Sequence, residues 1–392
     1  MNSHPPDLPA ASAEAPLSNG AQAGRAAPLL TSLFSQLQPV DEPTTRAEVR
    51  PLEASALRRS NWGKALGKLA RAKQSVSRRA GHLRLRARSL FSFGAAAQLQ
   101  AGAVPRPSAR DLRTDLALAV PLAWAGRVEL PAVRVAAIVH LFYDELALEI
   151  RSYLESIEEG VDVFISTGNE HQARLIRSAF AGWELGSIDV RVVPNIGRDI
   201  APKLVAFKDV LSRYEFVVLL HGKRSTHASV LAPWRQFTLE SLLGGPRVVA
   251  SILDIFDSQP TIGIVAAQHF EPVRRWLGWG RNFASSQILA RRMGFRLDPR
   301  RPLDFPSGSM FWARSAALAP LLGLGLRFED FDPEQGQQDG TLAHAIEHLF
   351  FYACEHAGYD WVKIGQPELF ESTPGIEHVA GPRQLTEWLH AN

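Results

Sequence analysis

The chain has 392 residues, of which 46% are hydrophobic and 21% are charged, so it can bury one large core or two smaller ones. Its formal net charge of +3 conceals an uneven distribution. Thirteen Lys or Arg and no Asp or Glu lie between Ala54 and Arg110, which leaves 30 basic and 40 acidic residues elsewhere. The basic character therefore belongs to one segment, and the rest of the chain carries a net charge of −10.

The single cysteine, Cys354, excludes an intramolecular disulfide and favours a reducing compartment. Residues 1–20 lack the basic start and apolar run of a secretion signal. No stretch reaches the ~18 uninterrupted apolar residues of a membrane-spanning helix. We therefore expect a cytoplasmic protein that can lie peripherally on the inner face of the cytoplasmic membrane.

The first 130 residues divide into two segments. Residues 1–55 mix Pro, Ala and Ser without periodicity, which predicts disorder. Residues 56–130 form a basic amphipathic helical segment and a linker, with three-and-four spacing of apolar positions. Residues 56–92 suit an anionic membrane surface, although a solvated helix or one docked on the protein fits equally. Nucleic acid is not expected as a partner, because interleaved aromatic residues are missing.

From residue 131 to residue 392 the pattern predicts one α/β domain with a Rossmann-like, mostly parallel sheet. Near-continuous apolar runs predict strands at Val133 to Tyr143, Val161 to Thr167, Ile188 to Val193, Glu215 to Leu220 and Ile262 to Ala266. Helices are expected at Glu145 to Ile157, Glu170 to Phe180 and Ala201 to Leu211. In such a fold, ligands bind beyond the carboxyl ends of the strands.

The exits of the first and fourth strands carry polar and aromatic side chains. His140, Phe142 and Tyr143 follow the first strand and can stack on a base, although the two aromatic residues also suit a core. His221, Lys223 and Arg224 follow the fourth strand and can cradle a diphosphate, the alternative being a solvated loop.

A turn ahead of the helix at Ala201 to Leu211 is the second candidate for donor binding. It contains Asn195, Gly197, Arg198, Asp199 and Lys203. The glycine permits close backbone approach, and the amino end of a helix favours a phosphate. The alternative is a capped helix in which Arg198 and Asp199 pair for structure.

The last third of the chain supplies candidates for the acceptor and for catalysis. Ser307, Gly308, Ser309 and Trp312 place small polar residues among aromatic ones, which suits a sugar face. The catalytic candidates are Asp339, Glu347 and His344. Asp339 is the preferred general base because a loop acid ahead of a helix can face a cleft, and Glu347 is second. Either carboxylate can instead be a helix cap or a surface charge.

These motifs, in this order, resemble the rhamnan synthesis F family of bacterial polysaccharide glycosyltransferases. The similarity runs from about Val133 to Gly365 and does not cover residues 1–125. It rests on Asn195 to Asp199, His221 to Lys223, Phe305 to Arg314 and Asp339 to Phe350. The resemblance implies transfer of a sugar, rhamnose by the family name, from a nucleotide-sugar donor to a lipid-linked or polysaccharide acceptor such as O-antigen of lipopolysaccharide.

The layout is also similar to the GT-A fold, in which an Asp-X-Asp metal site follows the corresponding strand. Here His221-Gly222-Lys223 occupies that place, so no metal ligand is assigned and no cofactor is expected, although a divalent ion stays open. Lys223 and Arg224 can themselves neutralise the leaving diphosphate. A lone loop base favours inversion at the anomeric carbon.

Two other functions fit the same sequence. The first is a non-catalytic nucleotide-sugar-binding or scaffold protein of the same pathway, which would differ only in whether the base faces a cleft. The second is a zinc hydrolase, because His344 to His348 matches H-x-x-E-H with His344 and His348 one turn apart.

Overall fold

The computed structural model describes residues 115–124, 135–222, 231, 233–337, 339–369 and 375–391. The predicted disordered segment and the basic segment proposed for a membrane surface lie outside the described residues. The same is true of Lys223 and Arg224 in the predicted diphosphate cradle.

Within the described residues the strands form one nine-stranded sheet with the order β4-β3-β2-β5-β7-β6-β8-β1-β9. The strands are β1 (Ala117–Ala119), β2 (Val135–His140), β3 (Val161–Thr167), β4 (Ile188–Val192), β5 (Phe216–His221), β6 (Ile262–Ala267), β7 (Phe311–Arg314), β8 (Asp360–Gly365) and β9 (Ile376–Glu377). Of the pairings between these strands, six are parallel, and the two antiparallel ones both involve β7. The expected α/β fold with a mostly parallel sheet is confirmed.

The central strands are apolar because helices cover both faces of the sheet. Every residue of β2, β3, β5 and β6 is buried, which explains their near-continuous apolar sequences. The five strands predicted from these runs are all present, and β3 coincides with its predicted bounds.

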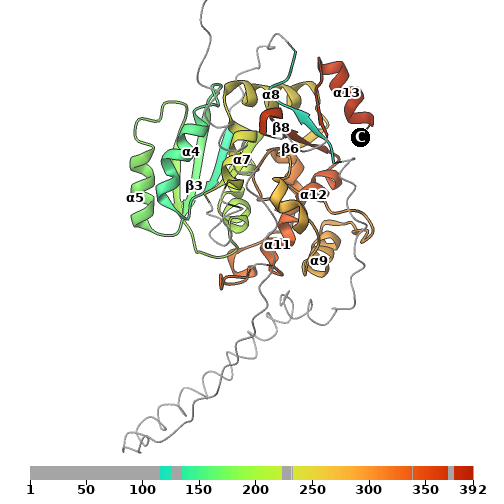
Figure 1. Ribbon diagram of the computed structural model, residues 1–392. Helices are drawn as coiled ribbons and strands as arrows, with labels where there is room; N and C mark the ends of the chain where they lie inside the picture. Colours follow the sequence, from blue (N-terminus) through green and yellow to red (C-terminus); the bar gives the residue numbers. More distant parts are fainter. Residues whose placement is uncertain are drawn as a thin grey trace, which may run out of the picture. The chain divides into compact units, whose positions relative to one another are not determined.

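Two apolar cores lie on opposite faces of the sheet. Five helices contribute to the first core: α4 (Ala147–Leu154), α5 (Glu170–Ala179), α7 (Trp234–Leu243), α8 (Pro246–Ser258) and α13 (Pro382–Ala391). The second core is built with η3 (Pro202–Ala206), α6 (Lys208–Leu211), α9 (Phe283–Met293), α10 (Ala319–Gly323), α11 (Leu342–Glu347) and α12 (Phe350–His356). Figure 1 shows α4 and α5 beside β3, whereas α13 lies near β8.

Within the described residues, five short 3₁₀ segments connect or extend these elements. They are η2 (Asp144–Leu146), η5 (Glu271–Trp276), η6 (Ser315–Leu318), η7 (Phe328–Asp330) and η8 (Pro367–Leu369). Among the helices of the described ranges, none has the length and apolarity required to cross a bilayer.

Three expectations need correction. Strand β1 pairs with β8 and β9, so the sheet includes residues ahead of the predicted domain start at residue 131. A strand of three residues is too short to show a pattern in sequence. The segment Phe305 to Trp312, for which no strand was predicted, runs into β7. The helix expected at Ala201 to Leu211 is a π-helical turn followed by one turn of α-helix.

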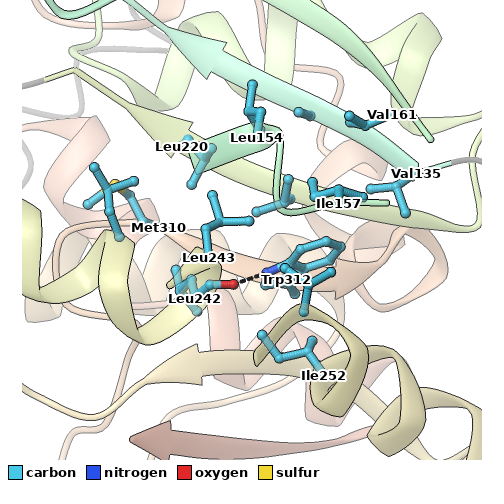
Figure 2. Close-up of a cluster of buried hydrophobic side chains, with 14 of the residues drawn as sticks. Val135, Leu154, Ile157, Val161, Leu220, Leu242, Leu243, Ile252, Met310 and Trp312 are labelled. Atoms are coloured by element: carbon cyan, nitrogen blue, oxygen red, sulfur yellow. Dashed lines mark hydrogen bonds between the residues drawn. The ribbon is translucent and has the colours of Figure 1, made fainter. Parts of the chain in front are cut away.

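Trp312, predicted to contact the acceptor, is instead a core residue. Its side chain is fully buried in the first core, and the indole Nε1 donates to the carbonyl of Leu242 at 3.1 Å. Figure 2 shows this hydrogen bond among the surrounding aliphatic side chains. Because side chains alternate along β7, the register places Trp312 on the face of the sheet that is covered by α7 and α8.

We predict that Trp312→Phe lowers the free energy of unfolding by ~1–3 kcal/mol, because the buried carbonyl of Leu242 loses its donor. Urea unfolding measures the change. The matched control is Trp276→Phe, which alters a side chain that is 53% exposed and should change stability by less than ~0.5 kcal/mol. Equal stability of the two variants would contradict the core role of Trp312.

Candidate functional site

Three strands present their last polar side chains at the same edge of the sheet. His140 of β2 is in register with His221 of β5 and with Ser166 of β3. Because β7 runs antiparallel to β5, its first residue, Phe311, lies opposite Leu219, near the carboxyl end of β5. The loop that precedes β7 therefore reaches the edge where parallel strands bind ligands.

Local backbone geometry forms the turn at residues 197–199. Gly197 and Arg198 both adopt left-handed conformations, with φ of 74° and 58°. A Cβ atom at Gly197 would lie 2.5 Å from the Cβ of Ala201 and 2.6 Å from the Phe331 ring, so only glycine fits. This turn aims Asp199 at the helix that follows and brings its carboxylate to Lys203.

Lys203 connects this turn to the loop before β7. Its side chain is fully buried, and Nζ donates to Asp199 Oδ2 at 2.7 Å and to the carbonyl of Ser309 at 2.6 Å. Burial lowers the pKa of Lys203, while Asp199 and the more distant Glu347 oppose the shift. Lys203 was predicted to bind the donor. Its side chain has no exposed surface and instead holds Asp199 and the Ser309 backbone in place.

Gly308 joins two further candidates. Its N–H donates to Glu347 Oε1 at 3.1 Å, and its carbonyl accepts from His221 Nε2 at 2.6 Å. The φ of Gly308 is 84°, and a Cβ atom there would lie 3.2 Å from the Trp234 ring. The predicted acceptor residues Gly308 and Ser309 thus lie beside the catalytic candidate Glu347 and the donor candidate His221.

His140 belongs to the same group. Its Nδ1 lies 2.9 Å from Ser166 Oγ, and burial lowers its pKa to about 4 despite the opposing charge of Asp199. The imidazole is therefore neutral at physiological pH, and it can donate or accept a hydrogen bond but does not add positive charge.

Asp339, the preferred general base, is occupied by structural hydrogen bonds. Its carboxylate accepts from the backbone N–H of Arg281 at 2.9 Å, from Asn282 Nδ2 at 2.6 Å and from the N–H of Gly340 at 2.8 Å. These bonds tie the loop before α11 to the start of α9. The carboxylate thus holds a loop in place, a role that differs from the general base and from the helix cap or surface charge considered from the sequence.

His344 is also held by its neighbours. Arg198 Nη1 lies 3.0 Å from His344 Nε2, and because arginine only donates, Nε2 is an acceptor. The other ring nitrogen lies 2.7 Å from Thr341 Oγ1. Arg198 also donates to the carbonyl of Gln337, so this guanidinium supports the loop rather than extending toward a donor.

The remaining donor candidates lie at the surface of the same edge. Phe142 is 38% exposed and contacts Tyr143 edge-on at 5.1 Å, while Tyr143 packs partly against the first core. Asn195 is exposed. Phe142 and Asn195 are therefore accessible from solvent.

The zinc alternative is not supported by the geometry. His348 packs between Phe305 and Trp279, with ring centroids at 4.5 and 5.7 Å, and burial lowers its pKa to about 4. Both ring nitrogens of His344 face Arg198 or Thr341. The two histidines therefore serve packing and loop structure.

One cluster in the described part of the chain combines ligand types that metals use: Asp115, His269 and Asp304. Lys363 contacts both carboxylates and Arg274 contacts Asp115, so positive charge is already supplied from protein side chains. The cluster does not fit a further cation.

His269 and Asp304 were missed from the sequence, although a signal existed. His269 follows the carboxyl end of β6 by two residues and lies 3.0 Å from the hydroxyl of the predicted acceptor residue Ser307. The rule that singled out His140 and His221 at strand exits would have selected His269 as well. Asp304 precedes Ser307 by three residues in the same loop.

Two hollows lined by described residues lie away from the polar groups of Glu347, Gly308 and His221. A hollow of about 750 Å³ lies between α4, α7 and α8, around Tyr153 and Glu240. A second of about 1070 Å³ lies at the amino edge of the sheet, near Lys208 and Arg314. Neither contains a predicted site residue, so the site is defined by its converging polar groups.

A doubly covered, mostly parallel sheet with polar groups converging at its carboxyl edge defines an α/β protein of the class in which ligands bind at this edge. The chain belongs to the rhamnan synthesis protein F family, whose family model matches residues 120–359. This match confirms the resemblance found in the sequence.

Two related proteins match this chain over only part of its length and part of their own. Two proteins named WxcX, from two strains of Xanthomonas campestris pv. campestris, are 39% identical over 191 residues. The match spans 48% of this chain and 27% of the relatives, so the chain spans about a quarter of their length.

Solved structures are similar only at a low level. Mannosyltransferase PcManGT from Pyrobaculum calidifontis, solved with GDP-Man and Mn²⁺, is 14% identical with a TM-score of 0.33, covering 59% of this chain and 54% of its own. The 4-diphosphocytidyl-2C-methyl-D-erythritol synthase from Anaerococcus prevotii is 10% identical with a TM-score of 0.32, covering 66% and 100%. Mouse xyloside xylosyltransferase 1 is 11% identical with a TM-score of 0.28, covering 62% and 85%.

We predict that Lys203→Met lowers the free energy of unfolding by ~3–5 kcal/mol, because Asp199 loses the ammonium that balances its charge. Chemical denaturation measures the loss. Lys208→Met, at an exposed position nearby, is the control and should cost less than ~0.5 kcal/mol. The double variant Asp199→Asn/Lys203→Met should cost less than the sum of the single changes, and strict additivity would contradict the pairing.

A second prediction concerns the stability of the protein at acidic pH. The pKa values of His140 and His348 are about 4 in the folded protein and 6.5 in the reference state, so the unfolded chain binds more protons between these values. The contribution of these two histidines to stability should therefore be constant above pH 7 and fall by ~3 kcal/mol per histidine as the pH falls to 4. Urea unfolding at several pH values tests this. His348→Phe should reduce the pH dependence, and an unchanged dependence in that variant would contradict the assignment.

Proposed function

We propose that the protein is a glycosyltransferase that transfers a sugar from a nucleotide-sugar donor to an acceptor in the synthesis of a bacterial surface polysaccharide. One observation carries the proposal: the carboxylate of Glu347 is held by the N–H of Gly308 at the carboxyl edge of the sheet, beside His221. Membership of the rhamnan synthesis family supports the polysaccharide. Rhamnose follows from the family name as the first sugar to test.

We assign Glu347 as the general base in place of Asp339. A base needs a lone pair directed at the acceptor hydroxyl, and three donors surround the carboxylate of Asp339. For Glu347 the hydrogen bond from Gly308 orients the carboxylate beside the loop that also contacts His221. Glu347 also lies on α11, a rigid element, which holds a catalytic group more precisely than a loop does.

The donor diphosphate would lie against the end of β5. His221 is the last residue of this strand, and Lys223 and Arg224 follow it in the sequence. Two cations at this point would offset the charge that develops on the leaving nucleoside diphosphate. Neutral His140 on the adjacent strand would hydrogen-bond the donor without adding charge.

The reaction then follows from these positions. Glu347 takes the proton of the acceptor hydroxyl as its oxygen forms a bond to the anomeric carbon. The bond between that carbon and the phosphate oxygen breaks, and the nucleoside diphosphate leaves with the electron pair. A single displacement of this kind inverts the anomeric configuration. The acceptor is a lipid-linked or polysaccharide chain of the O-antigen type, and we place the reaction on the cytoplasmic side of the membrane.

We predict that Glu347→Gln lowers turnover by ~10²–10⁴-fold, the usual contribution of a general base, and leaves donor binding nearly unchanged. Glutamine can still accept the hydrogen bond from Gly308, so the change removes basicity with little change in shape. The donor is first identified by thermal shift with dTDP-rhamnose, GDP-mannose and UDP-glucose, with and without EDTA. Turnover is then measured as release of the nucleoside diphosphate.

Asp339→Asn is the comparison variant. Because Asp339 clamps the loop before α11, its loss should lower the melting temperature while turnover per folded molecule is retained. If Glu347→Gln keeps full turnover and Asp339→Asn loses it, the general base is Asp339. Full turnover by both variants would disprove a carboxylate base, and donor binding without turnover in the wild type would favour the non-catalytic binding protein.

A further inference from the structure

A continuous chain of hydrogen bonds runs from the carboxylate of Asp304 through a buried imidazole to a half-buried hydroxyl. Asp304 Oδ1 lies 2.9 Å from His269 Nε2, and His269 Nδ1 lies 3.0 Å from Ser307 Oγ. His269 is 1% exposed, whereas Ser307 is half-buried. Ser307 adjoins Gly308, which contacts both Glu347 and His221, so the chain ends within the candidate site.

The carboxylate determines the direction of each hydrogen bond. An ionised carboxylate only accepts, so the hydrogen lies on His269 Nε2 and is donated to Asp304. In a neutral imidazole the other nitrogen is then an acceptor, and the hydroxyl of Ser307 donates to it. The lone pairs of Ser307 Oγ are left to accept from a ligand.

The surrounding charges support a neutral His269. Asp115 and Asp304 both contact Lys363, and Asp115 also contacts Arg274. Two mostly buried carboxylates are therefore balanced by two mostly buried cations before His269 is considered. Glu271 adds a further carboxylate to Arg274, but it is 44% exposed and solvent screens it. A protonated His269 would be a third cation, and Asp115 and Asp304 are already balanced by Lys363 and Arg274.

The arrangement does not suit a serine nucleophile. In hydrolases with Ser, His and Asp, backbone N–H groups near the serine stabilise the oxyanion. Here the N–H of Gly308 donates to Glu347, and the N–H of Ser309 donates to the carbonyl of Pro306 at 2.8 Å. With these donors engaged, the geometry points to orientation of the hydroxyl.

We propose that Ser307 accepts a hydrogen bond from a hydroxyl group of a neutral sugar, and that His269 and Asp304 are its positioning residues. The proposal rests on the proposed function in that the sugar is the acceptor of the transfer. An oxygen held as an acceptor attracts hydroxyl donors and disfavours phosphate or carboxylate groups, which can only accept. Ser307 thus selects the acceptor sugar and makes no contact with the donor diphosphate.

The first test needs no ligand. In protein labelled with ¹⁵N-histidine, the ring signals of His269 are identified by their loss in His269→Gln, and their shifts report which nitrogen carries the hydrogen. We expect the neutral form with hydrogen on Nε2 at pH 7.5, and Asp304→Asn should perturb it. Hydrogen on Nδ1, or on both nitrogens, would reverse the bond to Ser307 and overturn the proposal.

The second test measures ligand preference in the intact protein with an array of neutral and acidic glycans and with nucleoside diphosphates. Ser307→Ala should weaken binding of a neutral glycan by ~2- to 12-fold, the range of one hydrogen bond, and leave nucleoside diphosphate affinity unchanged. Ser307→Thr, which keeps the hydroxyl, should restore glycan binding, and Ser152→Ala, at an exposed position on α4, should have no effect.

Two outcomes separate this proposal from the proposed function. If Ser307→Ala weakens nucleoside diphosphate binding instead of glycan binding, Ser307 faces the donor and the proposal fails. If the wild type binds nucleoside diphosphate but no neutral glycan, the sugar site fails while the donor site stands. With an identified acceptor, Ser307→Ala should raise KM for that acceptor with kcat retained, the opposite of the pattern for Glu347→Gln.

Discussion

The buried ammonium of Lys203 is the interaction on which the site depends. It joins the carboxylate of Asp199 to the carbonyl of Ser309, which lies 106 residues after Lys203 in the chain. An ammonium without partners in the interior would cost several kcal/mol, so the turn after β4 and the loop before β7 must form together. Through Gly308, one residue from Ser309, this connection also sets the positions of Glu347 and His221.

The reversal of β7 provides the second constraint. In a purely parallel sheet, the chain that enters a strand lies at the edge opposite the ligand site. Because β7 is antiparallel to β5 and β6, the residues that lead into it reach the carboxyl edge instead. That edge therefore receives polar groups from strand exits, such as His140 and His269, and from a strand entry, Ser307 to Ser309. The family match over residues 120–359 includes all of these positions.

Polar side chains of the candidate site and of the loops around it have two kinds of surroundings. Asp339 is surrounded by backbone and amide donors that close a loop, and His344 is fixed between Arg198 and Thr341. In contrast, the chain from Asp304 through His269 ends at a half-buried hydroxyl. A group whose hydrogen bonds all lead back into the protein stabilises the fold, whereas one whose bonds lead outward can act on a ligand.

The sequence by itself determined the fold class, five strands and the strand exits at which His140 and His221 lie, because these depend on local patterns of apolar residues. It also carried the family motifs. Only the tertiary structure decided the roles of individual residues. Trp312 is core, Lys203 is buried, and Asp339 clamps a loop whose donors lie 57 and 58 residues away. The function of a carboxylate depends on the donors within ~3 Å of it, and here those donors come from distant segments that only folding brings together.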